Sequence, residues 1–412
     1  MSDARNICDV AIAGGGPAGS SAAIHLAKQG VQVLLVEEKR FPRAKLCGEF
    51  ISPECLNHFE SLGVADQILS AGGASLTQTI FYSRNGNSVT VPSRWFGDHV
   101  NALGLSRAEM DSKLLDRAKD LGVKVFEGAH ASDLLINQGR VEGIRLKSDS
   151  QLIDCQALIT VDATGRTRAL ARKLNGSPKA PEGRRRPRLI AFKAHLQNAQ
   201  SEAGTCEIYS YPGGYGGLSG IEGGISNLCF IASAKDVRHF GSDPDAVIRE
   251  VVCQNTRAAY TLASAQRCSE WLSVSLEGFG RQRLVPAEGL LAVGDAAAFI
   301  DPFVGSGMLM ALESAELAAQ AIVENLEKLK QTSSFASLAR DYRSRFDKRF
   351  NSRLRLCSFL RRVAFVPWLA EATIFFFASN IPLRHKVARG TRPAPEQNTY
   401  RPNADKTNRI SR

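Results

Sequence analysis

The glycine-rich stretch near the N-terminus has the residue types and the spacing of a phosphate-binding turn. Residues 14–19 read GGGPAG, a G-x-G-x-x-G pattern that follows an apolar run and precedes a helical pattern ended by Gly30. Such glycines permit a tight turn and let the backbone approach a pyrophosphate, and the helix N-terminus attracts phosphate. Glu37 ends the next apolar run 18 residues after Gly19, where a carboxylate can accept hydrogen bonds from ribose hydroxyls. We therefore predict a dinucleotide site with contacts at Gly14, Gly16, Pro17, Ala18, Gly19 and Glu37.

Two later stretches also combine glycine with aspartate. Residues 161–166 read VDATGR, and residues 294–307 read GDAAAFIDPFVGSG. In this order with the first motif, they resemble the flavoprotein superfamily of p-hydroxybenzoate hydroxylase, flavin-dependent halogenases and geranylgeranyl reductases. The resemblance covers about residues 7–335 and implies that the cofactor is FAD.

The resemblance also implies further FAD contacts. The G-D motif aspartate of that superfamily binds the ribityl chain, and it matches Asp295. A helix starting near Gly305 would direct its N-terminal dipole toward the flavin edge that becomes negative on reduction. Arg107 matches an arginine that holds the pyrophosphate, and a solvated first-turn arginine is the alternative. The contacts implied outside the first motif are Lys45, Arg107, Asp162, Gly165, Gly294, Asp295, Pro302, Gly305 and Gly307.

Two shorter stretches indicate the branch of the superfamily. Residues 45–49 read KLCGE and are similar to the K-x-C-G-E loop of the geranylgeranyl-reductase-like branch. Residues 211–216 read YPGGYG and are similar to a stretch that lines the substrate cavity in the same branch. The resemblance is therefore closest to that branch, and it implies Cys47, Glu49 and Tyr215 as catalytic candidates.

Each catalytic candidate has a structural alternative. Cys47 is either a thiolate favoured by Lys45 and Arg43 or a small packing residue. Glu49 either carries a proton to the substrate or caps a helix. Tyr215 either lines the substrate cavity or is a surface aromatic of a hairpin turn.

These features predict an FAD-dependent oxidoreductase acting on a small hydrophobic or aromatic substrate. We favour a monooxygenase (a hydroxylase); the alternatives are an ene-reductase of a prenyl lipid and a flavoprotein maturation factor that modifies a partner polypeptide. A halogenase is disfavoured because Trp95, Trp271 and Trp368 are isolated and form no W-x-W-x-I-P element. No second G-x-G-x-x-G follows a strand, so we expect NAD(P)H to dock transiently, or a reductase or ferredoxin to donate electrons.

Apolar periodicity predicts the elements that must position these residues. We expect a βαβ unit around the first motif, capping of a helix by Ser106, and antiparallel strands after residue 188. The remaining expected elements are helices over 53–70, 106–121, 305–326 and 335–362, a hairpin over 76–91, and strands over 123–126, 130–136, 141–146, 152–161 and 290–293.

The fold class that follows is α/β. We predict a discontinuous Rossmann-type FAD-binding domain, an inserted β-rich α+β substrate domain and a C-terminal helical region. We assign 1–75, 101–175 and 283–335 to the FAD-binding domain, 76–100 and 176–282 to the substrate domain, 336–390 to a basic helical region and 391–412 to a disordered tail.

Composition excludes several other classes of protein. The chain has 412 residues, of which 44% are hydrophobic and 23% charged, so it is neither disordered nor fibrous. Its nine cysteines form no C-x-x-C pair and its seven histidines do not cluster. We therefore expect reduced thiols, a cytoplasmic location and no metal site. The N-terminus runs directly into an apolar strand, so we expect no signal peptide.

The net charge of +11 is concentrated near the C-terminus. Residues 340–412 hold 17 Lys and Arg against 5 Asp and Glu, and no nucleic-acid-binding motif accompanies them. Residues 363–381 form an apolar segment of 19 residues with basic flanks and Glu371 near its centre. Its length and Glu371 oppose a membrane span. We expect either a lid on the substrate domain or peripheral contact with the inner face of a membrane.

Overall fold

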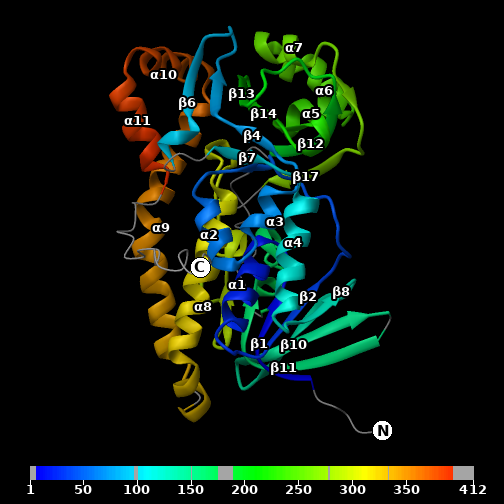
Figure 1. Ribbon diagram of the computed structural model, residues 1–412, viewed down its shortest axis with the longest axis vertical. Helices are drawn as coiled ribbons and strands as arrows, with labels where there is room; N and C mark the ends of the chain where they lie inside the picture. Colours follow the sequence, from blue (N-terminus) through cyan, green and yellow to red (C-terminus); the bar gives the residue numbers. More distant parts are fainter. Residues whose placement is uncertain are drawn as a thin grey trace, which may run out of the picture.

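The computed structural model describes residues 6–96, 101–149, 151–174, 189–276, 279–332 and 334–392. In Figure 1 one sheet lies below and another above, and long helices run along one side of both. Residues 175–188, where we placed a domain boundary, and 393–412, most of the predicted tail, lie outside the described residues.

The lower sheet carries the first glycine motif. Its order is β8-β2-β1-β11-β10-β9, and β19 also pairs with β11. The strands are β1 (Asn6–Ala13), β2 (Val33–Glu37), β8 (Lys124–Glu127), β9 (His130–Asn137), β10 (Arg140–Ser148), β11 (Gln151–Asp162) and β19 (Leu290–Ala292). Strands β8, β2, β1, β11 and β19 are parallel. All five residues of β2 are buried, as expected for a parallel strand covered on both faces.

Helices pack against this sheet and bury the largest apolar cluster. They are α1 (Pro17–Ala27), α2 (Cys55–Leu62), α3 (Ala65–Leu69), α4 (Arg107–Asp120), α8 (Gly307–Thr332) and α9 (Ala336–Ala364). The single helix predicted over 53–70 is wrong, because Gly63 adopts φ +79° and ends α2 before α3 begins. The predicted cap of α4 is confirmed: the N–H of Glu109 donates to Ser106 Oγ at 3.2 Å.

The upper sheet combines the predicted hairpin with the predicted antiparallel strands. Its order is β16-β12-β15-β14-β13-β5-β6, and β17 pairs with β12. The strands are β5 (Gln78–Tyr82), β6 (Ser88–Pro92), β12 (Leu189–Gln197), β13 (Thr205–Tyr211), β14 (Gly214–Gly220), β15 (Ser226–Ser233), β16 (Gln266–Arg267) and β17 (Leu272–Leu276). The pair β5–β13 is parallel, which we did not predict. Three short helices pack on one face: α5 (Ala234–His239), α6 (Pro244–Glu250) and α7 (Thr256–Leu262).

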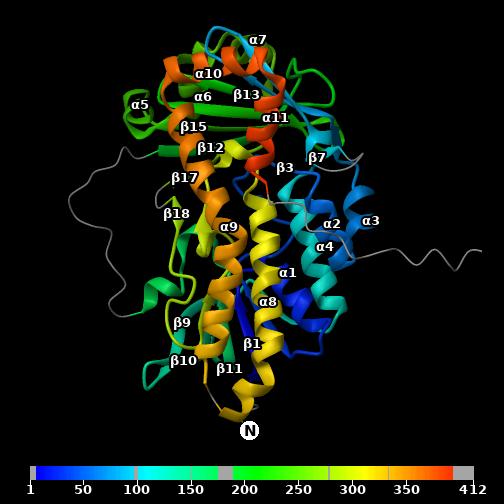
Figure 2. The same ribbon diagram turned by 90° about the vertical axis from the view of Figure 1, so that its left-hand side faces the viewer.

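Short strands and the C-terminal helices complete the described structure. The strands are β3 (Phe50–Ile51), β4 (Ala74–Leu76), β7 (Ala102–Gly104), β18 (Gly280–Arg281) and β20 (Ala298–Phe299). Helices α10 (Pro367–Ser379) and α11 (Ile381–Gly390) lie beside β6, and α8, α9, α10 and α11 occupy one side of the molecule (Figure 2). Thr391 and Arg392, which we assigned to the tail, are buried. Within the described residues, no helix is long and apolar enough to cross a membrane.

Candidate active site

The carboxyl ends of three parallel strands bring the first two motifs together. Ala13 of β1 lies opposite Val36 of β2 and Asp162 of β11. The N–H of Gly14 donates to Val36 O at 2.8 Å, and Pro17 begins α1 three residues later. The glycine-rich turn and the turn after β11 therefore leave the sheet at the same edge, where open α/β sheets bind ligands.

The first motif forms a cradle in which glycine is required. At Gly14, φ is +105°, and a Cβ would lie 2.4 Å from a backbone oxygen of the turn after β11. At Gly19 a Cβ would lie 1.8 Å from Gly14 O. Gly16 has more room, because its Cβ would lie 3.6 Å from Arg107 Nη2 and 3.8 Å from Arg43 Nη2. The N-terminus of α1 therefore faces two guanidinium groups across a space that glycine leaves open.

Three cationic groups, Arg43, Lys45 and Arg107, lie around this cradle together with the acids Glu37 and Asp111. Arg107 is buried and donates through Nε and Nη2 to the two oxygens of Asp111, at 2.9 and 2.7 Å. Arg43 Nη1 lies 3.1 Å from the same carboxylate. Partial burial and the charges of Arg43 and Arg107 lower the pKa of Lys45. Three cationic groups and the N–H groups behind Gly16 form a donor set suited to a pyrophosphate. The sequence motifs do not indicate a cofactor role for Arg43, which the structure places beside Arg107.

Two acids predicted to contact FAD also hold the turns of the first two motifs in place. Glu37 Oε2 accepts a hydrogen bond from the N–H of Gly15 at 2.7 Å. Asp162 Oδ1 accepts from the N–H of Thr164 at 3.1 Å. Gly165 continues the second turn at φ +73°, and no atom lies within 4 Å of its Cβ position. Each acid therefore fixes the backbone that faces the cradle.

The third motif packs directly on the first. A Cβ at Gly294 would lie 2.8 Å from the Cβ of Ala18 in α1. Asp295 follows in a short 3-10 turn (Gly294–Ala296). Burial raises the pKa of Asp295 to about 6, although the positive charges of Arg107 and Lys45 oppose this change. The structure thus brings all three motifs and the cationic groups to one site.

The turn after Asp301 leads into the long helix α8. Asp301 caps a 3-10 turn (Pro302–Val304) by accepting a hydrogen bond from a backbone N–H at 3.0 Å. Gly305 adopts φ +60°, and its Cβ would lie 3.4 Å from the ring of Phe50. Gly307 begins α8, so the N-terminus of α8 opens on this turn. The helix dipole there favours negative charge on a group bound against the turn.

Three aromatic side chains, Tyr215, Phe303 and Phe365, pack together at this turn, and we call them the aromatic wall. Tyr215 donates from its hydroxyl to Asp301 Oδ1 at 2.5 Å, and Arg361 Nε lies 2.9 Å from Asp301 Oδ2. The Tyr215 ring makes edge contacts with Phe303 and Phe365, with centroids 5.2 and 5.8 Å apart. Burial raises the pKa of Tyr215 well above its usual value, so the phenol stays protonated. Sequence reasoning identified Tyr215 but not Arg361 or Phe365, which come from α9 and the residue after it.

Helix α9 also reaches the other end of the same turn. Arg353 is 2% exposed and pairs with Glu313 of α8 at 2.7 Å. Its Nη2 donates to Ser306 O at 3.3 Å. One helix therefore contacts the turn through a side chain at each end of it.

A buried polar cluster lies beside the wall and centres on Glu49. Glu49 Oε1 accepts from the N–H of Arg107 at 3.0 Å and from Lys193 Nζ at 2.5 Å, and Oε2 lies 2.7 Å from His195 Nε2. Burial raises the pKa of Glu49, but His195 and Lys193 lower it more, so the net change is downward. Glu49 therefore caps α4 and is held as a carboxylate. Sequence reasoning missed Lys193 and His195, although their spacing of two puts both on one face of a strand.

Cys47 lies in the loop that joins this cluster to the wall. The N–H of Glu49 contacts Cys47 Sγ at 3.4 Å, and Asn227 Nδ2 donates to Cys47 O at 3.2 Å. The neighbouring Leu46 packs with the cluster that contains Tyr215. The thiol is half-buried. The loop thus spans from the glycine cradle to the upper sheet.

Comparison with known proteins agrees with the arrangement of the motifs. The model of the FAD binding domain family matches residues 7–336. A menaquinone reductase of Mycolicibacterium smegmatis is 28% identical over 76% of this chain and 75% of its own length. Digeranylgeranylglycerophospholipid reductase 2 of Methanopyrus kandleri is 25% identical over 83% of each chain. The structure of the flavin-dependent brominase Bmp2 superposes with a TM-score of 0.77, at 21% identity over 93% of each chain.

Proposed function

Because the chain belongs to the FAD binding domain family, we propose that it is an FAD-dependent reductase that saturates a carbon–carbon double bond in the prenyl chain of a lipid. The observation that carries this proposal is the apolar wall over the turn of 302–307. It belongs to a packed apolar cluster, of which Leu46, Tyr215, Ile231, Phe299, Phe303 and Phe365 are members. A hydrocarbon chain bound against the turn would meet these apolar side chains, which would keep water away from it. Two curated relatives, named as reductases of menaquinone and of a digeranylgeranyl lipid, support the same substrate class.

FAD fits the residues present. We propose that Gly14, Gly16, Pro17, Ala18 and Gly19 receive the pyrophosphate together with Arg43, Lys45 and Arg107. The acids Glu37, Asp162 and Asp295 would accept hydrogen bonds from ribose and ribityl hydroxyls. Gly165 and Gly294 have no side chain and would leave space in their turns for the cofactor. Pro302, Gly305 and Gly307 would support the isoalloxazine. Reduced FAD supplies a hydride, which ene reduction delivers to one carbon of the double bond.

The second carbon of the double bond needs a proton, and His195 is the group we propose to supply it. Its side chain is 21% exposed, and its Nε2 is paired with Glu49. Glu49 is then a positioning residue, because Lys193 and the first N–H of α4 hold it in place. Tyr215 would orient the substrate, and Cys47 would contact it from the loop. A positioned acid of this kind contributes about 10²–10⁴ in rate.

Hydroxylation of an aromatic substrate is the second candidate, because the same closed apolar wall also serves an oxygenase. In both cases the electrons would come from NAD(P)H or from a separate reductase or ferredoxin. We also propose a cytoplasmic protein that contacts a membrane peripherally through its C-terminal helices.

One experiment separates these functions. Holoprotein is incubated with NAD(P)H and with either menaquinone, a geranylgeranyl lipid or a series of phenols, while oxygen uptake and product mass are measured. A mass gain of two hydrogens without oxygen uptake is the expected result. A mass gain of one oxygen atom with stoichiometric oxygen uptake would establish the hydroxylase instead. No product from any of them, with modification of a co-expressed polypeptide, would indicate the maturation factor.

His195→Gln tests the proposed proton source. We expect a loss of kcat of about 10²-fold or more, with FAD content unchanged. Lys147→Gln, at an exposed position of β10, is the matched control. An unaltered kcat and unaltered pH profile of kcat in His195→Gln would remove this residue from the mechanism.

A further inference from the structure

Helix α10 has one face on the protein and one face in solvent. Ala370 and Ile374 are buried against the upper sheet, whereas Trp368 and Phe375 are 72% and 74% exposed. The one acid of this helix is turned inward, because Glu371 Oε1 accepts from Asn87 Nδ2 at 2.6 Å. The outward face therefore carries large aromatic side chains without a carboxylate.

The exposed apolar side chains continue on both neighbouring helices. Phe376 is 54% exposed on α10, Ile381 is 57% exposed at the start of α11, and Phe359 is 60% exposed on α9. Monomeric proteins scatter such residues singly, and several together mark a contact surface. These three helices lie on one side of the molecule (Figure 2).

Basic side chains surround these residues. From 348 to 392 the only acidic residue is Glu371, which faces the hairpin. The exposed basic residues of this region include Arg355, Arg362, Lys386 and Arg389. The surface is therefore both aromatic and cationic.

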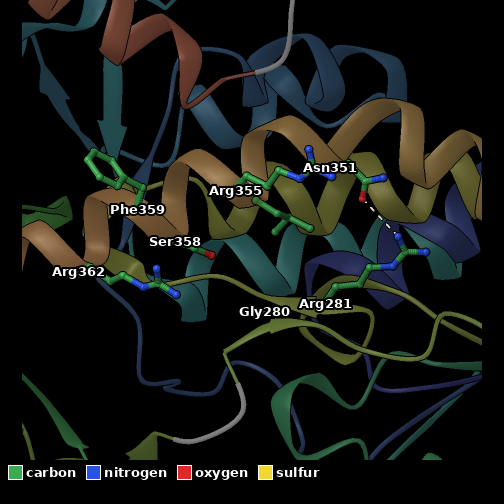
Figure 3. A pocket seen from close by; sticks show the side chains of 8 residues that line it. Gly280, Arg281, Asn351, Arg355, Ser358, Phe359 and Arg362 are labelled. Atoms are coloured by element: carbon green, nitrogen blue, oxygen red, sulfur yellow. Dashed lines mark hydrogen bonds between the residues drawn. The ribbon is translucent and has the colours of Figure 1, made fainter.

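A groove beside α9 places aromatic and cationic side chains next to each other. Figure 3 shows Arg281, Arg355 and Arg362 lining it together with Ser358 and Phe359. Arg281 is engaged with Asp347 and donates to Asn351 at 3.2 Å. Across the described ranges, no carboxylate forms an ion pair with Arg355 or Arg362. These two guanidinium groups are available to an anionic group beside an exposed phenylalanine.

We propose that the outward face of α10 with the start of α11, and the groove of Arg355 and Arg362, dock on a lipid bilayer that contains anionic lipid. Trp and Phe side chains then enter the boundary between headgroups and acyl chains, while the guanidinium groups meet lipid phosphates. Helix α10 has 13 residues, fewer than the about 20 that a span requires, so it lies in the plane of the interface.

The charge favours a bilayer over a second protein. The cores of protein interfaces are depleted in charged residues, whereas interfacial helices combine aromatic residues with Lys and Arg. The docking rests on the proposed function in one respect: a prenyl lipid substrate is held in the bilayer, so the enzyme reaches it by docking there. Arg361, between the groove residues Phe359 and Arg362 in sequence, pairs with Asp301, and Phe365, two residues before α10, contacts Tyr215 of the wall. Docking thus brings the wall next to the bilayer that holds such a substrate.

Vesicle binding of the holoprotein tests this proposal without measuring activity. We expect co-sedimentation with vesicles of phosphatidylcholine mixed with phosphatidylglycerol, weaker binding to phosphatidylcholine alone, and a blue shift of Trp368 emission. Trp368→Ser with Phe375→Ser should lower the partition coefficient about tenfold or more. Arg355→Gln with Arg362→Gln should lower it about twenty-fivefold, since each basic residue near an anionic surface contributes about fivefold.

Matched controls change other exposed residues of the same types. Leu152→Ser with Tyr260→Ser, and Arg172→Gln with Lys173→Gln, should leave vesicle binding unchanged. Equal vesicle binding by wild type and both docking variants would overturn the proposal. A dimer that dissociates in Trp368→Ser would also overturn it, in favour of a second copy of the chain. Vesicle binding without reduction of any prenyl lipid rejects the proposed function alone, and reduction of a detergent-dispersed lipid without vesicle binding rejects the docking alone.

Discussion

Replacing Asp295 by asparagine separates its cost to folding from its use in FAD binding. Its pKa is raised from 3.8 to about 6 by burial, which corresponds to about 3 kcal/mol lost from the folded state at neutral pH. Because Asp295 is only partly buried, we expect about 1–3 kcal/mol. The contribution of the neutral Asp295 carboxyl to the unfolding free energy is complete below pH 3.8. It is lost as the pH rises through about 6. Asp295→Asn removes the charge and keeps the shape.

The assay is urea unfolding of the deflavinated proteins at a series of pH values. Wild type and Asp295→Asn should have similar unfolding free energies near pH 4, and the variant should be more stable by about 1–3 kcal/mol at pH 8. The variant should also retain less FAD after gel filtration, because a carboxylate accepts hydroxyl hydrogen bonds more strongly than an amide. A stability difference that is independent of pH, or a variant less stable at pH 8, would refute the reasoning.

Three further substitutions test the site. Gly19→Ala should destabilise the protein by about 3 kcal/mol or more, because its Cβ would meet a backbone oxygen; Gly48→Ala, with open space around its Cβ, should be neutral in the same thermal melts. Arg107→Lys should weaken FAD binding about ten- to hundredfold in fluorescence titrations, and an unchanged affinity would exclude its pyrophosphate role. Tyr215→Phe should lower the unfolding free energy by about 1–3 kcal/mol, because the buried oxygen Oδ1 of Asp301 loses one of its two donors; a neutral result in urea would contradict the bond.

Elements with strong local signals were predictable from the sequence. The first motif lies where a strand, a glycine turn and a helix must follow each other, and the structure places β1, α1 and β2 there. The helix over 106–121 has a serine cap and an apolar stripe, and α4 (Arg107–Asp120) matches it. In both cases the deciding interactions join residues a few positions apart.

Features that depend on distant parts of the chain were not predictable. The parallel pair β5–β13 joins residues more than a hundred positions apart, and no periodicity encodes such a pairing. No periodicity predicts the contacts of Arg361 with Asp301 and of Lys193 with Glu49 either. A buried ion pair is visible in the sequence only as two charged residues, each of which would usually be solvated.

The two contacts that α9 makes with the turn of 302–307 bear on how this chain can be divided. The family match ends at residue 336, where α9 begins. A fragment cut there would contain all three glycine motifs. It would nevertheless leave Asp301 without Arg361, and Glu313 without Arg353. The site therefore includes residues beyond the segment that the family model matches. Because Arg353 and Arg361 of α9 contact the turn next to the proposed flavin ring, a fragment that ends at residue 336 should fold and retain FAD less well than the full chain.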